Sequence, residues 1–214
     1  MVNKIQAGNL VGQTIAMAAK AGPTMLLLSG GSSVNVAVRA LGAVATEDRH
    51  NLFVTLADER YGKRGHADSN WKALLGAGFE PDKYTHYEPL WKEAQSPEKT
   101  AHELEKIIIR ERKKAKTVIA LLGIGIDNHT AGILPGSEAA KEQHHLVIEY
   151  KGSDFERLTI APPMFDTIDL AFVYAEGEAK EAAVEALYKS ASSVSEPAQL
   201  VKKAKHYTVL HAET

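Results

Sequence analysis

The segment from Gly123 to Ser137 contains the residues best suited to chemistry. Asp127 and His129 lie two positions apart, near enough for the carboxylate to hold the imidazole or to position a substrate. A neutral histidine titrates near physiological pH and therefore suits the work of a general base. Glycines such as Gly125 let the backbone approach a ligand closely. This pattern favours a catalytic His129 assisted by Asp127 over a surface histidine in a glycine-rich loop.

A second segment is suited to binding an anion. Gly30, Gly31 and Ser32 follow an apolar run and precede a helical pattern. Two glycines allow a tight turn, and the N-terminus of the following helix favours an anion such as phosphate. The segment lacks both the Gly-Lys-Ser/Thr of a Walker loop and the third spaced glycine of a dinucleotide fingerprint. A plain turn with a serine capping the helix remains the alternative.

Three consecutive charged residues, Asp58, Glu59 and Arg60, follow another apolar run. Arg60 is able to bind a phosphate through two N–H groups, and Asp58 or Glu59 is able to orient Arg60 or a neighbouring group. A solvated turn with an internal ion pair is the alternative. We favour the binding role, because the run before the charges is apolar up to its last residue.

Arg157 and Lys180 add two further cations near the ends of apolar runs. Each of them alone would be interpreted as a surface charge. The adjacent His144 and His145 have no partner at a spacing typical of metal ligands, and the chain contains no cysteine. We therefore expect no metal site, no thiolate nucleophile and no cofactor.

A regular framework must position these residues, and apolar runs of strand length alternate with helical patterns along the chain. The runs lack strict alternation of apolar and polar residues, which indicates strands buried on both faces, as in a parallel sheet. The predicted strands cover residues 24–29, 51–57, 117–122, 170–174 and 206–210. The predicted helices cover residues 15–20, 33–41, 97–116 and 178–190, and another begins near Asn70 behind a cap at Asp68 or Ser69.

Alternating strands and helices indicate βαβ units. We expect an α/β fold of three layers, with a mostly parallel, doubly wound sheet of the modified Rossmann type and helices on both faces. Ligands of such sheets bind beyond the carboxyl ends of the strands, where most of the candidate residues lie. Neither a repeat nor a linker is visible, so residues 1–214 are expected to form one domain.

The composition argues against several classes of protein. The 25 Lys and Arg residues are balanced by 27 Asp and Glu residues, and this balance disfavours a strongly basic nucleic-acid-binding protein. The longest apolar run is far shorter than the roughly 20 residues that a membrane helix needs. The first residues lack the apolar region of a targeting signal. We expect a cytoplasmic protein without a nucleic-acid or membrane partner.

Taken together, these motifs resemble those of the 6-phosphogluconolactonase family, a branch of the glucosamine-6-phosphate isomerase/deaminase superfamily. The resemblance runs in order over about residues 10 to 190. The family motifs are S-G-G-S-T-P, D-E-R followed by D-S-N, G-x-G-x-D-G-H-T-A-S-L-F-P-G, R-x-T and G-x-x-K. The similar segments here are residues 29–32, 58–60 with 68–70, 123–136, 157–159 and 177–180.

The residues after His129 separate two branches of that superfamily. The deaminases follow their histidine with a segment that ends in Asn-Glu-Pro, whose glutamate assists ring opening. The corresponding stretch here, Gly132 to Pro135, contains no acid, which favours the lactonase branch. Asn128 replaces the glycine between the family's aspartate and histidine. If that glycine has a positive φ, asparagine is the next most tolerated residue, so the turn is expected to survive.

The resemblance implies hydrolysis of 6-phospho-D-glucono-1,5-lactone to 6-phosphogluconate by a base-activated water, in the oxidative pentose phosphate pathway. It implies His129 and Asp127 as the catalytic pair. The residues implied for binding the substrate and its phosphate are Gly30, Gly31, Ser32, Asp58, Glu59, Arg60, Asn70, Gly125, Arg157 and Lys180.

The expected small-molecule partner is a phosphorylated sugar lactone, bound by a monomer or a small homo-oligomer. Two alternatives stay open at this point. One is an isomerase or deaminase that acts on an amino-sugar phosphate. The other is a non-catalytic module that binds a sugar phosphate.

Overall fold

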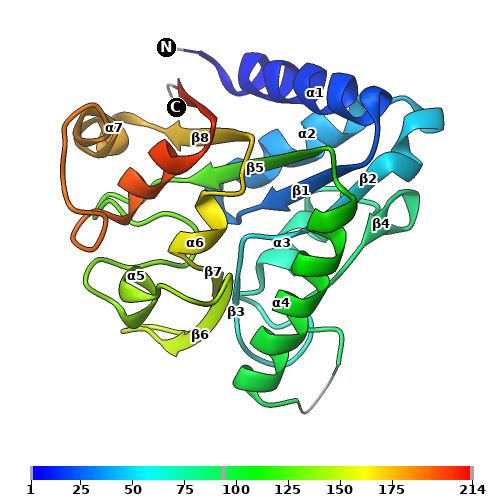
Figure 1. Cartoon of the computed structure of the whole chain (residues 1–214). Helices are drawn as coiled ribbons and strands as arrows, with labels where there is room; N and C mark the ends of the chain where they lie inside the picture. Colours follow the sequence, from blue (N-terminus) through cyan, green and yellow to red (C-terminus); the bar gives the residue numbers. More distant parts are fainter. Residues whose placement is uncertain (1, 93–94, 213–214) are drawn as a thin grey trace.

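A parallel sheet of six strands forms the centre of the molecule (Figure 1). The structure is a computed structural model that describes residues 2–92 and 95–212. The strand order is β4-β2-β1-β5-β8-β9, and each neighbouring pair is parallel. The strands are β1 (Thr24–Leu28), β2 (Leu52–Leu56), β4 (Thr85–His86), β5 (Thr117–Gly123), β8 (Leu170–Glu176) and β9 (His206–Ala212). The prediction of a mostly parallel sheet with helices on both faces is confirmed.

Both faces of this sheet are covered, which explains why its strands are uniformly apolar. Met25 and Leu27 of β1 belong to one hydrophobic cluster, whereas Leu26 and Leu28 belong to another, because side chains alternate across a strand. Figure 1 shows α1 and α2 on one side of the sheet and α4 on the other. The helices are α1 (Lys4–Ala21), α2 (Val34–Gly42), α3 (Asn70–Gly76), α4 (Pro97–Lys114), α5 (Glu138–Lys141), α6 (Pro162–Phe165) and α7 (Glu181–Leu187).

Local signals in the sequence set several helix ends. Asn3 caps α1 in a reciprocal capping box with Gln6, and Gly22 ends that helix with a φ of 145°. Ser69, rather than Asp68, caps α3, because its hydroxyl accepts a hydrogen bond from the backbone N–H of Lys72. Across the described ranges, no helix is long and apolar enough to cross a membrane.

The predicted helices at residues 33–41 and 178–190 each begin with a tighter turn than expected. A 3-10 turn, Gly31–Ser33, precedes α2, and another, Glu178–Lys180, precedes α7. Gly31 has a φ of 67° and Gly177 a φ of 87°, in the region that favours glycine. Both turns lie just beyond a strand of the large sheet, so they shape the edge at which the candidate residues meet.

A second, antiparallel sheet was not predicted from the sequence. It consists of β3 (Asp58–Arg60), β7 (Glu156–Ile160) and β6 (Val147–Lys151), in the order β3-β7-β6. Ala57 joins the two sheets, because its N–H donates to Leu28 of β1 while its carbonyl accepts from the N–H of Ile160. Residues 58–60 therefore do not form the solvated turn that was the alternative interpretation. They continue the chain from β2 into a strand of the other sheet.

Glu59 ties this short strand to helix α3. Its carboxylate is 1% exposed and accepts hydrogen bonds from the backbone N–H groups of Arg60, Asn70 and Trp71, at 2.7, 2.7 and 3.0 Å. The hydroxyl of Ser69 donates a fourth, at 2.9 Å. Burial raises the pKa of Glu59, and these four donors oppose the rise. An acceptor here satisfies the free N–H groups of the first helical turn and interacts favourably with the helix dipole.

The substitution Glu59→Ala is expected to lower the free energy of unfolding by at least about 2 kcal/mol, because it leaves buried N–H groups without an acceptor. In a domain of this size the corresponding decrease in Tm is ~5 °C or more. Thermal and denaturant unfolding followed by circular dichroism would measure it. Glu80→Ala is the matched control, since Glu80 pairs with Lys83 on the surface. Equal stability of the two variants would contradict the assignment.

Candidate active site

A polar cavity of about 120 Å³ lies at the carboxyl ends of β1 and β5 and beside β3. Five regions of the chain meet there: the glycine turn after β1, the charged strand β3, the start of α3, the loop after β5, and the turn that precedes α7. This is the edge at which parallel α/β sheets bind their ligands. The residues that line the cavity are Ser29, Gly30, Gly31, Ser32, Asp58, Arg60, Asn70, Gly123, Ile124, His129, Ala131 and Lys180.

The loop after β5 folds back on itself and presents His129 to the cavity. The N–H of Gly125 donates to the carbonyl of His129, and the N–H of Asn128 donates to the carbonyl of Gly125. Asn128 has a φ of 65°, so the position does require a left-handed backbone. This confirms the expectation that asparagine replaces glycine here without loss of the turn.

His129 and Asp127 form a close pair within this loop. Nδ1 of the imidazole lies 2.6 Å from Oδ1 of Asp127, which also accepts from the backbone N–H of His129 at 3.2 Å. Partial burial opposes ionisation of Asp127, but the adjacent His129 holds the pKa of the carboxyl below its ordinary value. An ionised Asp127 favours the tautomer with the proton on Nδ1. Nε2 is then the nitrogen that can accept a proton.

Gly125 is required by the geometry of this pair rather than by a ligand. A Cβ atom at this position would lie 2.1 Å from Nδ1 of His129 and 2.3 Å from Oδ1 of Asp127. Neither Gly125 nor Asp127 lines the cavity, whereas His129 does. Asp127 contacts the imidazole, and Gly125 leaves the space in which the two side chains meet.

On the opposite wall, Asn70 holds Asp58. The side-chain amide of Asn70 donates to Oδ2 and to the main-chain carbonyl of Asp58, both at 2.9 Å. Gly30 makes room for this contact, because a Cβ atom there would lie 1.9 Å from Oδ1 of Asn70. Asn70 is almost fully buried, so its role is mainly to position Asp58 and the glycine turn.

Two buried oxygen atoms on this wall lack a partner within the described part of the chain. They are Oδ1 of Asp58 and Oγ of Ser29, and the two residues are each 5% exposed. Buried polar groups without a hydrogen bond are rare in proteins, and both residues line the cavity. Together they offer an acceptor and a donor to a ligand hydroxyl. Ser29 was not among the predicted site residues, although its place directly after β1 was a usable signal.

The cations of the cavity are Arg60 and Lys180. Arg60 donates from Nη1 to the carbonyl of Asp68 at 2.9 Å, while its Nε is buried without a partner in the described residues. Burial lowers the pKa of Lys180, and the charge of Asp127 opposes that shift. No carboxylate forms an ion pair with Arg60 or Lys180 within residues 2–92 and 95–212. The cavity therefore presents positive charge that an anion can neutralise.

Besides Gly125, two other predicted binding residues lie outside the cavity, Glu59 and Arg157. Both carboxylate oxygens of Glu59 are engaged with α3, as described above. Arg157 is buried on β7, and its Nη2 donates to both carboxylate oxygens of Asp154, at 2.9 and 2.8 Å. The prediction that Arg157 converges on the cavity with Arg60 and Lys180 is not supported by this geometry. We assign structural roles to Glu59 and Arg157.

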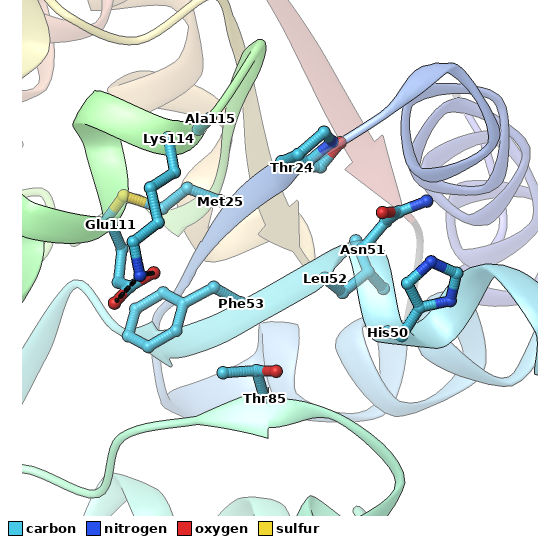
Figure 2. Close-up of a pocket in the computed structure, with 11 residues that line it drawn as sticks. Thr24, Met25, His50, Asn51, Leu52, Phe53, Thr85, Glu111, Lys114 and Ala115 are labelled. Atoms are coloured by element: carbon cyan, nitrogen blue, oxygen red, sulfur yellow. Dashed lines mark hydrogen bonds and ion pairs between the residues drawn. The ribbon is translucent and has the colours of Figure 1, made fainter.

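A larger hollow of about 250 Å³ lies at the other end of the sheet, where β1, β2 and β4 begin (Figure 2). Its lining is mostly apolar and includes Met25 and Phe53. Figure 2 shows Glu111 paired with Lys114. The distance from Nζ of Lys114 to Oε2 of Glu111 is 3.0 Å. This larger hollow contains neither a histidine–carboxylate pair nor cations without counter-charges, so the smaller cavity is the candidate for chemistry.

The described residues include no group of three or more potential ligands arranged to hold a metal ion.

Comparison with known proteins shows which family this chain resembles. The sequence profile of the family described as "Glucosamine-6-phosphate isomerases/6-phosphogluconolactonase" matches residues 4–210. The 6-phosphogluconolactonase of Helicobacter pylori is 25% identical over 172 residues, which cover 74% of this chain and 70% of that protein. The 6-phosphogluconolactonase of Pseudomonas aeruginosa is 29% identical over 136 residues, which cover 61% of this chain and 54% of that protein.

Among solved structures, a 6-phosphogluconolactonase from Shewanella baltica superposes with a TM-score of 0.80. The superposition covers 100% of this chain and 95% of that one, at 16% sequence identity. At such identity the likeness concerns the fold alone. Because the family profile spans nearly the whole sequence, the chain belongs to the glucosamine-6-phosphate isomerase/6-phosphogluconolactonase family.

Proposed function

We propose that this chain hydrolyses 6-phospho-D-glucono-1,5-lactone to 6-phosphogluconate. The observation that carries the proposal is the pairing of His129 with Asp127 in a cavity that also holds Arg60 and Lys180. A phosphosugar lactone presents an electrophilic carbonyl at one end and a dianionic phosphate at the other. The cavity supplies a base for the first and cations for the second. The names of the curated relatives support the same assignment.

In the proposed reaction, Nε2 of His129 takes a proton from a water molecule as that water attacks the lactone carbonyl. The carbon–oxygen bond of the ring then breaks, and the imidazolium returns the proton to the departing ring oxygen. Asp127 holds the imidazole in the productive tautomer and stabilises its protonated form. A positioned general base contributes typically about 10²–10⁴-fold to a rate.

Binding is proposed to use the other walls of the cavity. Arg60, Lys180 and the glycine turn at Gly30 to Ser32 take the phosphate, because they offer charge and N–H groups without a carboxylate partner. The free oxygens of Asp58 and Ser29 take sugar hydroxyls. Fixing both ends of the substrate places its carbonyl beside His129, which is the main benefit of a remote phosphate.

The substitution His129→Asn is expected to lower kcat on the order of 10²-fold or more, because asparagine has no basic nitrogen. The affinity for 6-phosphogluconate should change little, since the phosphate contacts remain. Turnover is measured by generating the lactone with glucose-6-phosphate dehydrogenase and following 6-phosphogluconate above spontaneous hydrolysis. His144→Asn, at an exposed histidine outside the cavity, is the matched control. Unchanged turnover in His129→Asn would remove His129 from the mechanism.

The substitution Asp127→Asn is expected to reduce kcat on the order of 10²-fold while KM stays within about threefold. An amide can donate to Nδ1, which favours the tautomer that carries its proton on Nε2 and cannot accept another. Because the pKa of Asp127 lies below its ordinary value, the wild-type carboxylate stays ionised in neutral and mildly acid solution. A kcat equal to that of wild type near pH 7 would contradict the orienting role.

The substitution Arg60→Ala is expected to raise KM for the phosphorylated lactone on the order of 10- to 100-fold, because a charged hydrogen bond to phosphate is lost. KM for D-glucono-1,5-lactone, which has no phosphate, should not change. Arg112→Ala, at an exposed position on α4, serves as the control. Equal effects on both lactones would show that Arg60 does not contact the phosphate.

The same preparations distinguish the lactonase from the isomerase or deaminase alternative. Ile133 is fully buried in the core, and the segment Gly132 to Pro135 contains no carboxylate that could assist ring opening. We therefore expect no release of ammonia from glucosamine 6-phosphate. Ammonia release without lactone hydrolysis would overturn the proposed function.

A further inference from the structure

Two arginines face each other directly across the antiparallel pair of β3 and β7. The register places Arg60 opposite Arg157. Like charges at directly opposed positions destabilise a sheet, so the structure must compensate for this repulsion. Only Arg60 of the two lines the cavity. The groups that offset the repulsion between the two arginines therefore determine how Arg60 is presented to an anion.

The charge of Arg157 is taken up by the turn that joins β6 and β7. Asp154 in this turn accepts two hydrogen bonds from Nη2 of Arg157, which is 6% exposed. Partial burial opposes ionisation of Asp154, but Arg157 holds the pKa of the carboxyl below its ordinary value. Asp154 and Arg157 thus form an ion pair. Asp154 neutralises Arg157, and Arg60 keeps its positive charge.

The next residue of the same turn, Phe155, lies against both arginines. Its ring centre is 5.5 Å from Cζ of Arg60 and 5.7 Å from Cζ of Arg157. Both distances fall in the range of cation–π attraction, in which the negative face of the ring stabilises a guanidinium. Phe155 is half-buried, so the interaction is partly protected from water.

Backbone hydrogen bonds hold Phe155 in this place. The N–H of Gly152 donates to the carbonyl of Phe155 at 2.8 Å, and the N–H of Phe155 donates to Oδ1 of Asp154 at 2.8 Å. The N–H of Tyr61, directly after β3, donates to the carbonyl of Glu156 at 2.7 Å. The turn is therefore anchored both within itself and to the strand that carries Arg60.

An aromatic ring differs from a carboxylate as a support for a cation. A carboxylate would fix Arg60 but would neutralise its charge and occupy the N–H groups that a phosphate needs. The ring of Phe155 attracts the guanidinium through its face and leaves those N–H groups free. The side chain of Arg60 also donates to a neutral carbonyl, that of Asp68. Arg60 is thus fixed in position while its charge stays available.

We propose that Phe155 is a positioning residue, whose ring holds the guanidinium of Arg60 ready for the substrate's phosphate while Asp154 neutralises Arg157. This inference rests on the proposed function, in which Arg60 binds the phosphate. A guanidinium that is already in place loses less conformational freedom on binding, so the effect of Phe155 falls on affinity rather than on the chemical step.

The test compares the variants Phe155→Ala, Phe155→Leu and Phe155→Tyr. Leucine keeps an apolar side chain of similar reach without a π face, and tyrosine keeps the face. We expect Phe155→Ala and Phe155→Leu to raise KM for the phosphorylated lactone about three- to tenfold, with kcat within about twofold of wild type. Phe155→Tyr should restore KM, and KM for D-glucono-1,5-lactone should stay the same in all three. Melting curves show which variants fold, and Phe155→Leu carries the test where Phe155→Ala does not.

Two further measurements sharpen this test. Trp91→Ala is the matched control, because Trp91 contacts Lys92 by another cation–π interaction, 4.9 Å from the ring centre, and lines no part of the cavity. In an Arg60→Ala background, Phe155→Leu should have no additional effect on KM, since the two residues are expected to act as a unit. An equal KM in Phe155→Leu and wild type, or additive effects in the double variant, would overturn the proposal.

Binding of inorganic phosphate, measured by calorimetry, separates failure of this inference from failure of the proposed function. If the wild-type chain does not hydrolyse the lactone, the proposed function fails. Weaker phosphate binding in Phe155→Leu, with Phe155→Tyr equal to wild type, would still support the positioning of Arg60. If the wild-type chain hydrolyses the lactone and all the Phe155 variants bind phosphate with equal affinity, the positioning of Arg60 by Phe155 is contradicted.

Discussion

The buried carboxylate of Glu59 is the interaction on which the candidate site depends. It accepts hydrogen bonds from the backbone N–H groups of Asn70 and Trp71 in the first turn of α3 and thereby fixes strand β3 against that helix. Side chains alternate along a strand, so a Glu59 that faces α3 sends Asp58 and Arg60 to the other side, where both line the cavity. The same contact places Asn70 at the start of α3, within reach of Asp58. One capping interaction thus orients the wall of the cavity that lies opposite His129.

The electrostatics of the site come from selective neutralisation rather than from an excess of positive charge. The chain has a net charge of −2, yet no carboxylate forms an ion pair with Arg60 or Lys180 in the residues that the structure describes. Arg157 lies directly opposite Arg60 in the antiparallel ladder, but Asp154 takes up its charge. An anion that enters the cavity therefore meets cations that need not first leave a protein partner, which lowers the cost of binding.

The base of the site is positioned by backbone geometry as much as by its hydrogen bond. Asn128 adopts a left-handed conformation, and Gly125 leaves the space in which Asp127 and His129 meet. The positive-φ turn brings two residues that are only two positions apart into a 2.6 Å contact. In this short loop, the contact between Asp127 and His129 therefore depends on neighbouring residues that tolerate the backbone conformation.

Much of the framework and of the chemistry was determined by the sequence by itself. Uniformly apolar strands such as β1 predict burial on both faces, since the two faces of the sheet need two separate cores. Local signals also limited the cap of α3 to Asp68 or Ser69 and predicted the pairing of Asp127 with His129, because both interactions join residues close in the chain. The position of Gly30, Ser32, Arg60 and Lys180 around one cavity followed from the rule that ligands bind at the carboxyl edge of a parallel sheet.

Only the tertiary structure decided the roles that depend on pairing between distant segments. The antiparallel ladder joins residues 58–60 to residues 157–159, nearly a hundred positions later, and no local pattern predicts which strands will pair. In that ladder Glu59 faces α3 and Arg157 pairs with Asp154, so neither of these two predicted binding residues lines the cavity. It also brought Phe155 against Arg60. The sequence specifies which groups are able to do the chemistry, but long-range packing determines which of them face the same space.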